Sequence, residues 1–173
     1  MKSLMHITQR LSALLGDHSV VIGGVCAVLH GSERMTLDVD FASDLDLDTV
    51  SKCLTDAGIL FTVKKGDLLD VLPWVIHGEL DEISFQVMPS QAIGIDIEHA
   101  VRSQGIQFAA VEDFIISKCI AGSHQDLHDV AVIVLRNPSL HDFALQMASK
   151  HQCDERLNDW LTDSRLLERY AKV

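Results

Sequence analysis

Residues 21–40 read VIGGVCAVLHGSERMTLDVD, and the prediction of the fold begins from this segment. The β-branched run at 19–22 predicts a short buried strand that stops at Gly23 and Gly24. A short helix is expected over 25–30, because a glycine follows it and glycine commonly ends helices. The segment therefore predicts a strand, a glycine turn and a helix in direct succession.

A second strand is expected over residues 37–42, where aspartate alternates with apolar side chains. Asp38 and Asp40 are two residues apart, so a strand would point both carboxylates to the same face. Two carboxylates on a rigid strand can bind a divalent cation, usually Mg²⁺ together with phosphate oxygens and water. The intervening apolar side chains are expected to point into the core: Leu37, Val39 and Phe41.

The glycine turn is a candidate phosphate site. Glycine lets the backbone approach a ligand closely, and the N–H groups at the start of a helix attract phosphate. Gly23 and Gly24 are therefore candidate phosphate-binding residues, with a plain tight turn as the alternative. For Asp38 and Asp40 the alternative is the solvated face of an ordinary strand.

The remaining hydrophobic periodicity predicts further strands and helices. We expect strands at 59–64, 71–77, 83–88 and 106–109. We expect helices at 3–15, 46–57 with its N-cap at Ser43-Asp44, 96–103, 111–121, 127–135, 140–150 and 153–170. The sum is an α/β (α+β) class, with a mixed sheet flanked by helices and a helical C-terminal third. Residues 1–122 are expected to form the core, and 123–173 a helical extension packed on it.

Composition excludes some classes of partner. The 173-residue chain has a formal net charge of −11, whereas bulk binding of duplex DNA needs a Lys/Arg surface. No apolar run reaches the about 18 residues of a membrane span, and the N-terminus lacks the apolar stretch of a signal peptide. A cytoplasmic protein without a membrane partner is expected. Its four cysteines are expected to be free thiols: Cys26, Cys53, Cys119 and Cys153.

Residues 21–40 also resemble a known family. A strand, Gly-Gly, a helix and His-Gly precede Arg34 and Thr36, and the Asp-apolar-Asp pattern follows. This order resembles the nucleotidyltransferase superfamily, especially the branch that includes the AbiEii-type toxins. Residues 111–118, which end in Lys118, are similar to a lysine-bearing helix of that family.

The resemblance implies a nucleotidyltransferase-type fold and a function. It implies metal-dependent transfer of a nucleoside monophosphate from an NTP to a hydroxyl of a protein or RNA. Asp38 and Asp40 would be catalytic residues and ligands of Mg²⁺ or Mn²⁺. The implied nucleotide-binding residues are Gly23, Gly24, Arg34, Thr36 and Lys118. A toxin role would add an antitoxin-like partner.

One position departs from the family pattern. A third carboxylate from a later strand usually completes the metal site, but Gln86 stands at that place. Asp81 or Glu82, just before the strand, are alternative sources of a carboxylate. Glutamine offers one neutral oxygen, which is a poor replacement for an anion beside Mg²⁺. The alternative function is therefore a catalytically degenerate binding or interaction module.

Several side chains allow both a functional and a structural interpretation. Arg34 either contacts phosphate or pairs with a carboxylate and braces the aspartate-bearing strand. Lys118 either contacts a triphosphate or is an exposed lysine at a helix end. Asp126 and Asp129 fit an ordinary helix start, and the C-terminal helices either dock on the core or form a homodimer interface. A zinc site is the less favoured interpretation of three histidines: His30, His124 and His128.

Overall fold

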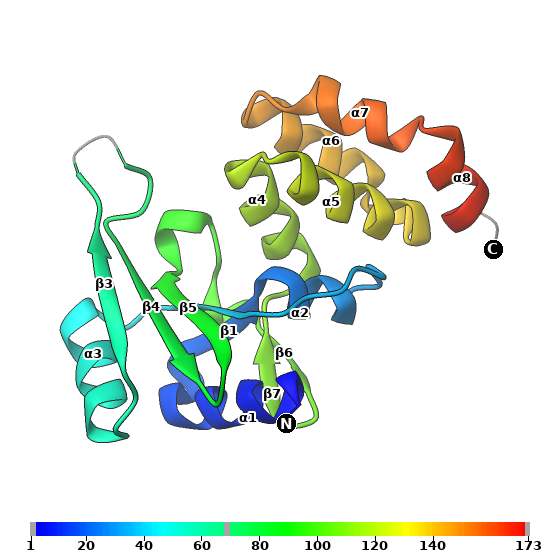
Figure 1. Cartoon of the computed structure of the whole chain (residues 1–173). Helices are drawn as coiled ribbons and strands as arrows, with labels where there is room; N and C mark the ends of the chain where they lie inside the picture. Colours follow the sequence, from blue (N-terminus) through cyan, green and yellow to red (C-terminus); the bar gives the residue numbers. More distant parts are fainter. Residues whose placement is uncertain (1–2, 68–69, 172–173) are drawn as a thin grey trace.

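The computed structural model describes residues 3–67 and 70–171 (Figure 1). Its helices are α1 (Leu4–Leu15), α2 (Gly23–Leu29), α3 (Leu47–Asp56), α4 (Val111–Ala121), α5 (His124–Arg136), α6 (His141–Lys150), α7 (Asp154–Leu161) and α8 (Ser164–Tyr170). Its strands are β1 (Ser19–Ile22), β2 (Val39–Ser43), β3 (Phe61–Lys65), β4 (Trp74–Leu80), β5 (Ile83–Pro89), β6 (Val101–Ser103) and β7 (Ile106–Phe108).

The strands of the described residues form one mixed sheet in the order β3-β4-β5-β2-β1-β7-β6. At its centre, β2 runs antiparallel to β1 and parallel to β5. β1 in turn runs parallel to β7. The predicted α/β class, with a mixed sheet and a helical C-terminal third, is confirmed.

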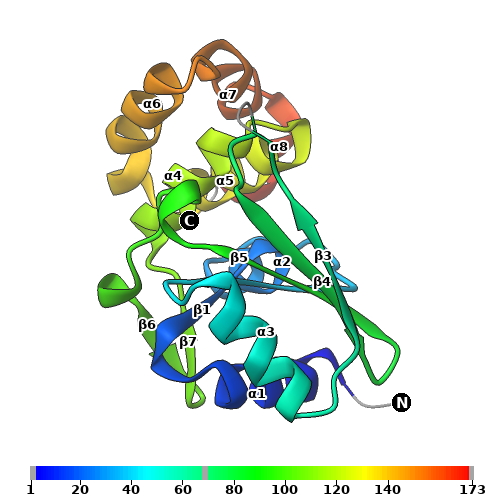
Figure 2. The same cartoon turned by 90° about the vertical axis from the view of Figure 1, so that its left-hand side faces the viewer.

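One face of the central strands packs against α1. Helices α1 and α3 lie on one side of the molecule, and α4 to α8 lie on the opposite side (Figures 1 and 2). Val39 and Phe41 of β2 are fully buried, as are Ile7 and Leu11 of α1. Since strand side chains alternate, Asp40 points to the other face of the sheet.

Helix α5 is the centre of the C-terminal helical layer, because α4, α6, α7 and α8 all contact it. A capping box at Ser123 and Asp126 fixes its start. Its residues 129–134 are all buried. The proposed division of the chain at residue 122 stays a prediction. No described helix is both long and apolar enough to cross a membrane.

The start of β2 differs from the prediction. The strand begins at Val39, because its partner β1 ends at Ile22, which lies opposite Asp40. Asp38 therefore immediately precedes the strand. Leu37 is 81% exposed, so the prediction that it points into the core was wrong, whereas the prediction for Val39 was right.

The helix predicted over residues 96–103 was also wrong. The chain forms a 3₁₀ turn at Ile97–His99 and then the strand β6, which pairs with β7. Gln104 and Gly105 join the two strands, and both have positive φ angles, +51° and +78°. Such pairs of left-handed residues favour a tight two-residue hairpin.

Two predictions about the ends of helices were wrong, and in both cases an aspartate provides the observed cap. Asp46 caps α3 by accepting a hydrogen bond from the Thr49 N–H, so the predicted cap at Ser43-Asp44 was wrong. The helix predicted over 153–170 is interrupted at Asp163, which caps α8. All four cysteines are free thiols, as predicted, and three of them are buried: Cys26, Cys119 and Cys153.

Candidate functional site

The carboxylate pair lies at the start of the central strand. Asp40 is opposite Ile22 of β1 and beside Gln86 of β5. Gly23 follows Ile22 directly, so strand pairing brings the glycine turn next to the Asp40 side chain. The structure thus places the predicted turn and the predicted carboxylates together.

The turn has no room for larger residues. A Cβ atom on Gly23, whose φ is +61°, would lie 1.9 Å from Asp40 Oδ2. A Cβ atom on Gly24 would lie 2.4 Å from Thr36 Oγ1 and 3.1 Å from Arg34 Nη2. The space on the Cβ side of both glycines is thus filled by the protein's own side chains. Glycine is required here by the close approach of Asp40 and Thr36.

The two carboxylates have different surroundings. The Thr36 hydroxyl donates a hydrogen bond of 2.9 Å to Asp38 Oδ1, which orients that side chain. No described residue donates a hydrogen bond to Asp40. Burial, together with the nearby charge of Asp38, raises the pKa of Asp40 to about 6, although Lys118 and Arg34 act in the opposite direction. At neutral pH the site therefore holds an excess of negative charge.

A buried charge network faces this pair from the helical layer. Asp129 of α5 is fully buried and accepts hydrogen bonds from Ser32 Oγ at 3.1 Å and Arg34 Nη1 at 3.0 Å. Lys118 of α4 lies 2.6 Å from Asp126 and 3.7 Å from Asp129. The network ties the loop before β2 to α4 and α5.

These contacts bear on the earlier interpretations of Arg34, Lys118 and Asp126. Arg34 pairs with a carboxylate, as one of its two interpretations required. Lys118 is only 8% exposed, so its interpretation as an exposed lysine was wrong. Asp126 serves the helix start, as predicted. The role of Asp129 was missed, although its position in an apolar stretch of α5 indicates a buried side chain.

The residue beside Asp40 on β5 is an amide, where the family resemblance implies a third carboxylate. Gln86 lies in register with Asp40 on the adjacent strand, as the family pattern predicted. Asp81 lies in the turn between β4 and β5 and pairs with Arg10 at 2.6 Å, and Glu82 is its neighbour in that turn. Both are at least four residues from Gln86 along the chain, so neither supplies the missing carboxylate.

The donor set fits one type of cation. No group of three His, Cys, Asp or Glu side chains in the described part of the chain could hold a metal ion. Asp38 and Asp40 nevertheless offer two carboxylates whose charge is not compensated by hydrogen bonds at Asp40. Mg²⁺ is commonly bound by one or two carboxylates, with water and substrate phosphates completing its shell. The pair therefore suits Mg²⁺ or Mn²⁺ carried by a nucleotide.

The histidines serve packing and backbone contacts. His30 Nε2 lies 2.8 Å from the Ala109 carbonyl oxygen. His124 and His128 contact the ring of Trp160 edge-on, with centroid distances of 4.6 and 4.8 Å. Nothing in the described residues supports the zinc interpretation.

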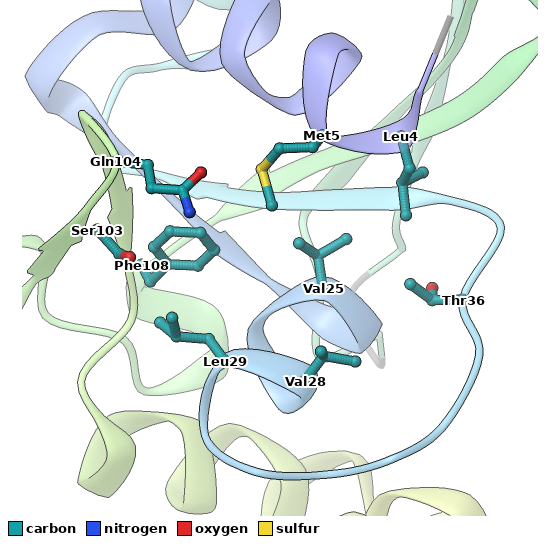
Figure 3. Close-up of a pocket in the computed structure, with 9 residues that line it drawn as sticks. All are labelled: Leu4, Met5, Val25, Val28, Leu29, Thr36, Ser103, Gln104 and Phe108. Atoms are coloured by element: carbon teal, nitrogen blue, oxygen red, sulfur yellow. The ribbon is translucent and has the colours of Figure 1, made fainter. Parts of the chain in front are cut away.

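Two cavities border the site. A groove of about 500 Å³ extends from Asp38 over β5, β4 and β3. A mostly apolar cavity of about 320 Å³ lies between α1, α2 and the β6–β7 turn (Figure 3). Thr36, which donates a hydrogen bond to Asp38, lines the apolar cavity, but neither Asp38 nor Asp40 does. Of these two cavities, only the groove is lined by a residue of the carboxylate pair, which is Asp38.

Comparisons with known proteins concern the fold. No protein-family model matches the sequence, and no curated protein matches it. A crystal structure described as a "putative nucleotidyltransferase from H. pylori" matches with a TM-score of 0.52 and 14% identity, over 98% of this chain and 88% of that one. At this identity the likeness shows a nucleotidyltransferase-type fold, as predicted.

Two further structures are more distant. JHP933 from Helicobacter pylori matches with a TM-score of 0.43 and 13% identity, over 97% of this chain and 100% of that one. A tRNA nucleotidyltransferase, complexed with a primer tRNA and an incoming ATP analog, matches at 0.39 and 11%, over 88% of this chain and 57% of that one. With TM-scores this low, neither adds to the assignment of the fold.

Proposed function

We propose that this protein binds an NTP with Mg²⁺ or Mn²⁺ and transfers its nucleoside monophosphate to a hydroxyl of a protein or RNA. The observation that carries the proposal is the state of Asp40. Its carboxylate is largely buried beside Asp38, receives no hydrogen bond from a described residue, and has a pKa raised to about 6. A buried carboxylate without a hydrogen-bond donor does not stabilise a fold, whereas a bound divalent cation would compensate its negative charge.

The residues around the carboxylate pair would have different roles. Gly23 and Gly24 would border the phosphates, and Asp38 and Asp40 would hold the cation. A bound cation would stabilise the negative charge that develops during transfer. Thr36 keeps Asp38 oriented through its hydrogen bond. Arg34 and Lys118 already pair with carboxylates, so they would act on the phosphates mainly through their charge.

A second function is favoured by Gln86, which replaces the third carboxylate beside Asp40. In that case the protein would bind a nucleotide without transferring it and act as a binding or interaction module. If the protein transfers the nucleotide, we further propose that it belongs to the AbiEii-type branch and has an antitoxin-like partner. Nucleotide binding is common to both functions, and transfer separates them.

Calorimetry of ATP and GTP binding tests the shared claim. We expect binding at pH 7.5 that requires Mg²⁺ or Mn²⁺ and is lost in the double variant Asp38→Asn/Asp40→Asn. The matched control is Asp44→Asn/Asp48→Asn, which removes two exposed carboxylates from the next segment and should bind normally. At pH 5 the affinity should fall about tenfold, because Asp40 must lose its proton before it can hold a cation.

Two results would count against the proposal. The first is wild-type protein that binds neither nucleotide with either cation. The second is binding that survives equally in both double variants, since the carboxylate pair would then be irrelevant to it. If binding occurs, transfer of label from α-labelled NTP separates the enzyme from the binding module.

A further inference from the structure

The polar face of the sheet extends well beyond the carboxylate pair. One cross-strand row runs over four strands and consists of Thr62, His77, Gln86 and Asp40. In the next row, Glu79 of β4 pairs with Ser84 of β5. The groove of about 500 Å³ lies over these rows and includes Asp38.

The two sides of β2 differ in charge. On the β1 side lie the glycine turn and Arg34, whose Nη2 is 3.1 Å from the position of a Cβ on Gly24. On the β5 side lies the groove, and none of its lining residues is Lys or Arg. Its charged members are Asp38 and Glu79, and Glu79 is an exposed carboxylate without an ion pair in the described part of the chain.

In-line displacement at phosphorus requires the attacking oxygen and the leaving oxygen on opposite sides. Under the proposed function, the phosphates lie on the β1 side, next to the glycine turn and Arg34. The attacking hydroxyl must then arrive from the β5 side, which is the groove. The strand order β3-β4-β5-β2-β1 places the strands of the groove and β1 on opposite sides of β2.

We propose that the groove over β3, β4 and β5 is the acceptor site and takes a polypeptide segment whose serine or threonine lies beside Lys or Arg. This inference rests on the proposed function. Glu79, together with Asp38 when no cation is bound to it, would attract the basic residue, whereas the phosphates of RNA would meet no Lys or Arg among the lining residues. Leu60, which also lines the groove and is 86% exposed, offers an apolar contact for a side chain of a peptide.

The reaction balances with this acceptor. The hydroxyl oxygen of the peptide forms a bond to the α-phosphorus of the NTP, and the bond between that phosphorus and the bridging oxygen to the β-phosphate breaks. Pyrophosphate leaves with the electron pair of the broken bond. The hydroxyl proton passes to a water molecule. The products are a nucleotidylated peptide and pyrophosphate.

Fluorescence anisotropy with labelled peptides tests the groove without nucleotide. The probes are a serine peptide flanked by arginines, the same peptide flanked by glutamates, and an RNA oligonucleotide of similar length. We expect the arginine peptide to bind best. Glu79→Lys should raise its Kd about fivefold to tenfold, because an attraction becomes a repulsion. Glu79→Gln should have a smaller effect in the same direction.

The matched control is Glu155→Lys, which makes the same charge change at an exposed residue of α7 and should alter the Kd less than twofold. An unchanged Kd in both Glu79 variants, or tighter binding of the RNA, would overturn the acceptor assignment. Calorimetry on the same protein separates the two proposals. Absence of nucleotide binding overturns the proposed function, whereas nucleotide binding without peptide binding overturns the groove assignment alone.

Discussion

Gly23→Ala is expected to lower the free energy of unfolding by about 2 to 5 kcal/mol and to abolish metal-dependent nucleotide binding. A left-handed conformation costs a residue with a Cβ about 1 to 2 kcal/mol, and overpacking adds about 1 to 3 kcal/mol. The new methyl group would lie 1.9 Å from Asp40 Oδ2, so the carboxylate or the turn must move. Urea denaturation measures the loss of stability, and calorimetry measures the loss of binding.

Gly58→Ala is the control for the backbone contribution. Gly58 has a similar φ of +68°, but nothing lies within 4 Å of its Cβ position. Its substitution should cost only about 1 kcal/mol and leave nucleotide binding unchanged. Equal costs at the two glycines would show that the contact between Gly23 and Asp40 does not constrain the site.

Asp129→Asn is expected to destabilise the protein by about 3 to 5 kcal/mol, the usual loss when one partner of a buried ion pair is removed. Asp129 is fully buried, and its loss would leave Arg34 and Lys118 with less compensating charge. The loop before β2 would also lose its anchor on α5, so nucleotide affinity should fall. Chemical denaturation and calorimetry check the two effects.

The control for Asp129 is an exposed pair of the same kind. Asp56 lies 3.1 Å from Lys52, and their side chains are 64% and 78% exposed. Asp56→Asn should cost less than about 0.5 kcal/mol. If Asp129→Asn costs no more than Asp56→Asn, the buried network does not hold the two layers together.

Local patterns predicted the elements whose signals are short-range. The β-branched run before Gly23 and the alternation around Asp40 placed β1 and β2, and the apolar periodicity gave α4 with its observed bounds. The segment 96–103 was misassigned because its hairpin depends on left-handed angles at Gln104, a residue type that rarely adopts them. The predicted start of β2 was two residues too early, because β1 ends at Ile22 and its pairing with β2 therefore stops at Asp40.

The candidate site was predictable in part for the same reason. Asp38, Asp40 and the glycine turn lie within one short segment, so spacing alone placed them together. Asp129 is 95 residues from Arg34, and no local pattern joins the two. The register of Gln86 with Asp40 likewise depends on strand pairing, and only the family motif indicated it in advance.

A crystal structure of the protein with Mn²⁺ and a non-hydrolysable NTP analogue tests the central claim most directly. The account predicts an anomalous peak for Mn²⁺ between the carboxylates of Asp38 and Asp40, with the triphosphate directed toward Gly23 and Gly24. Ordered nucleotide and Mn²⁺ bound elsewhere on the protein, with the pair left without a metal, would contradict it.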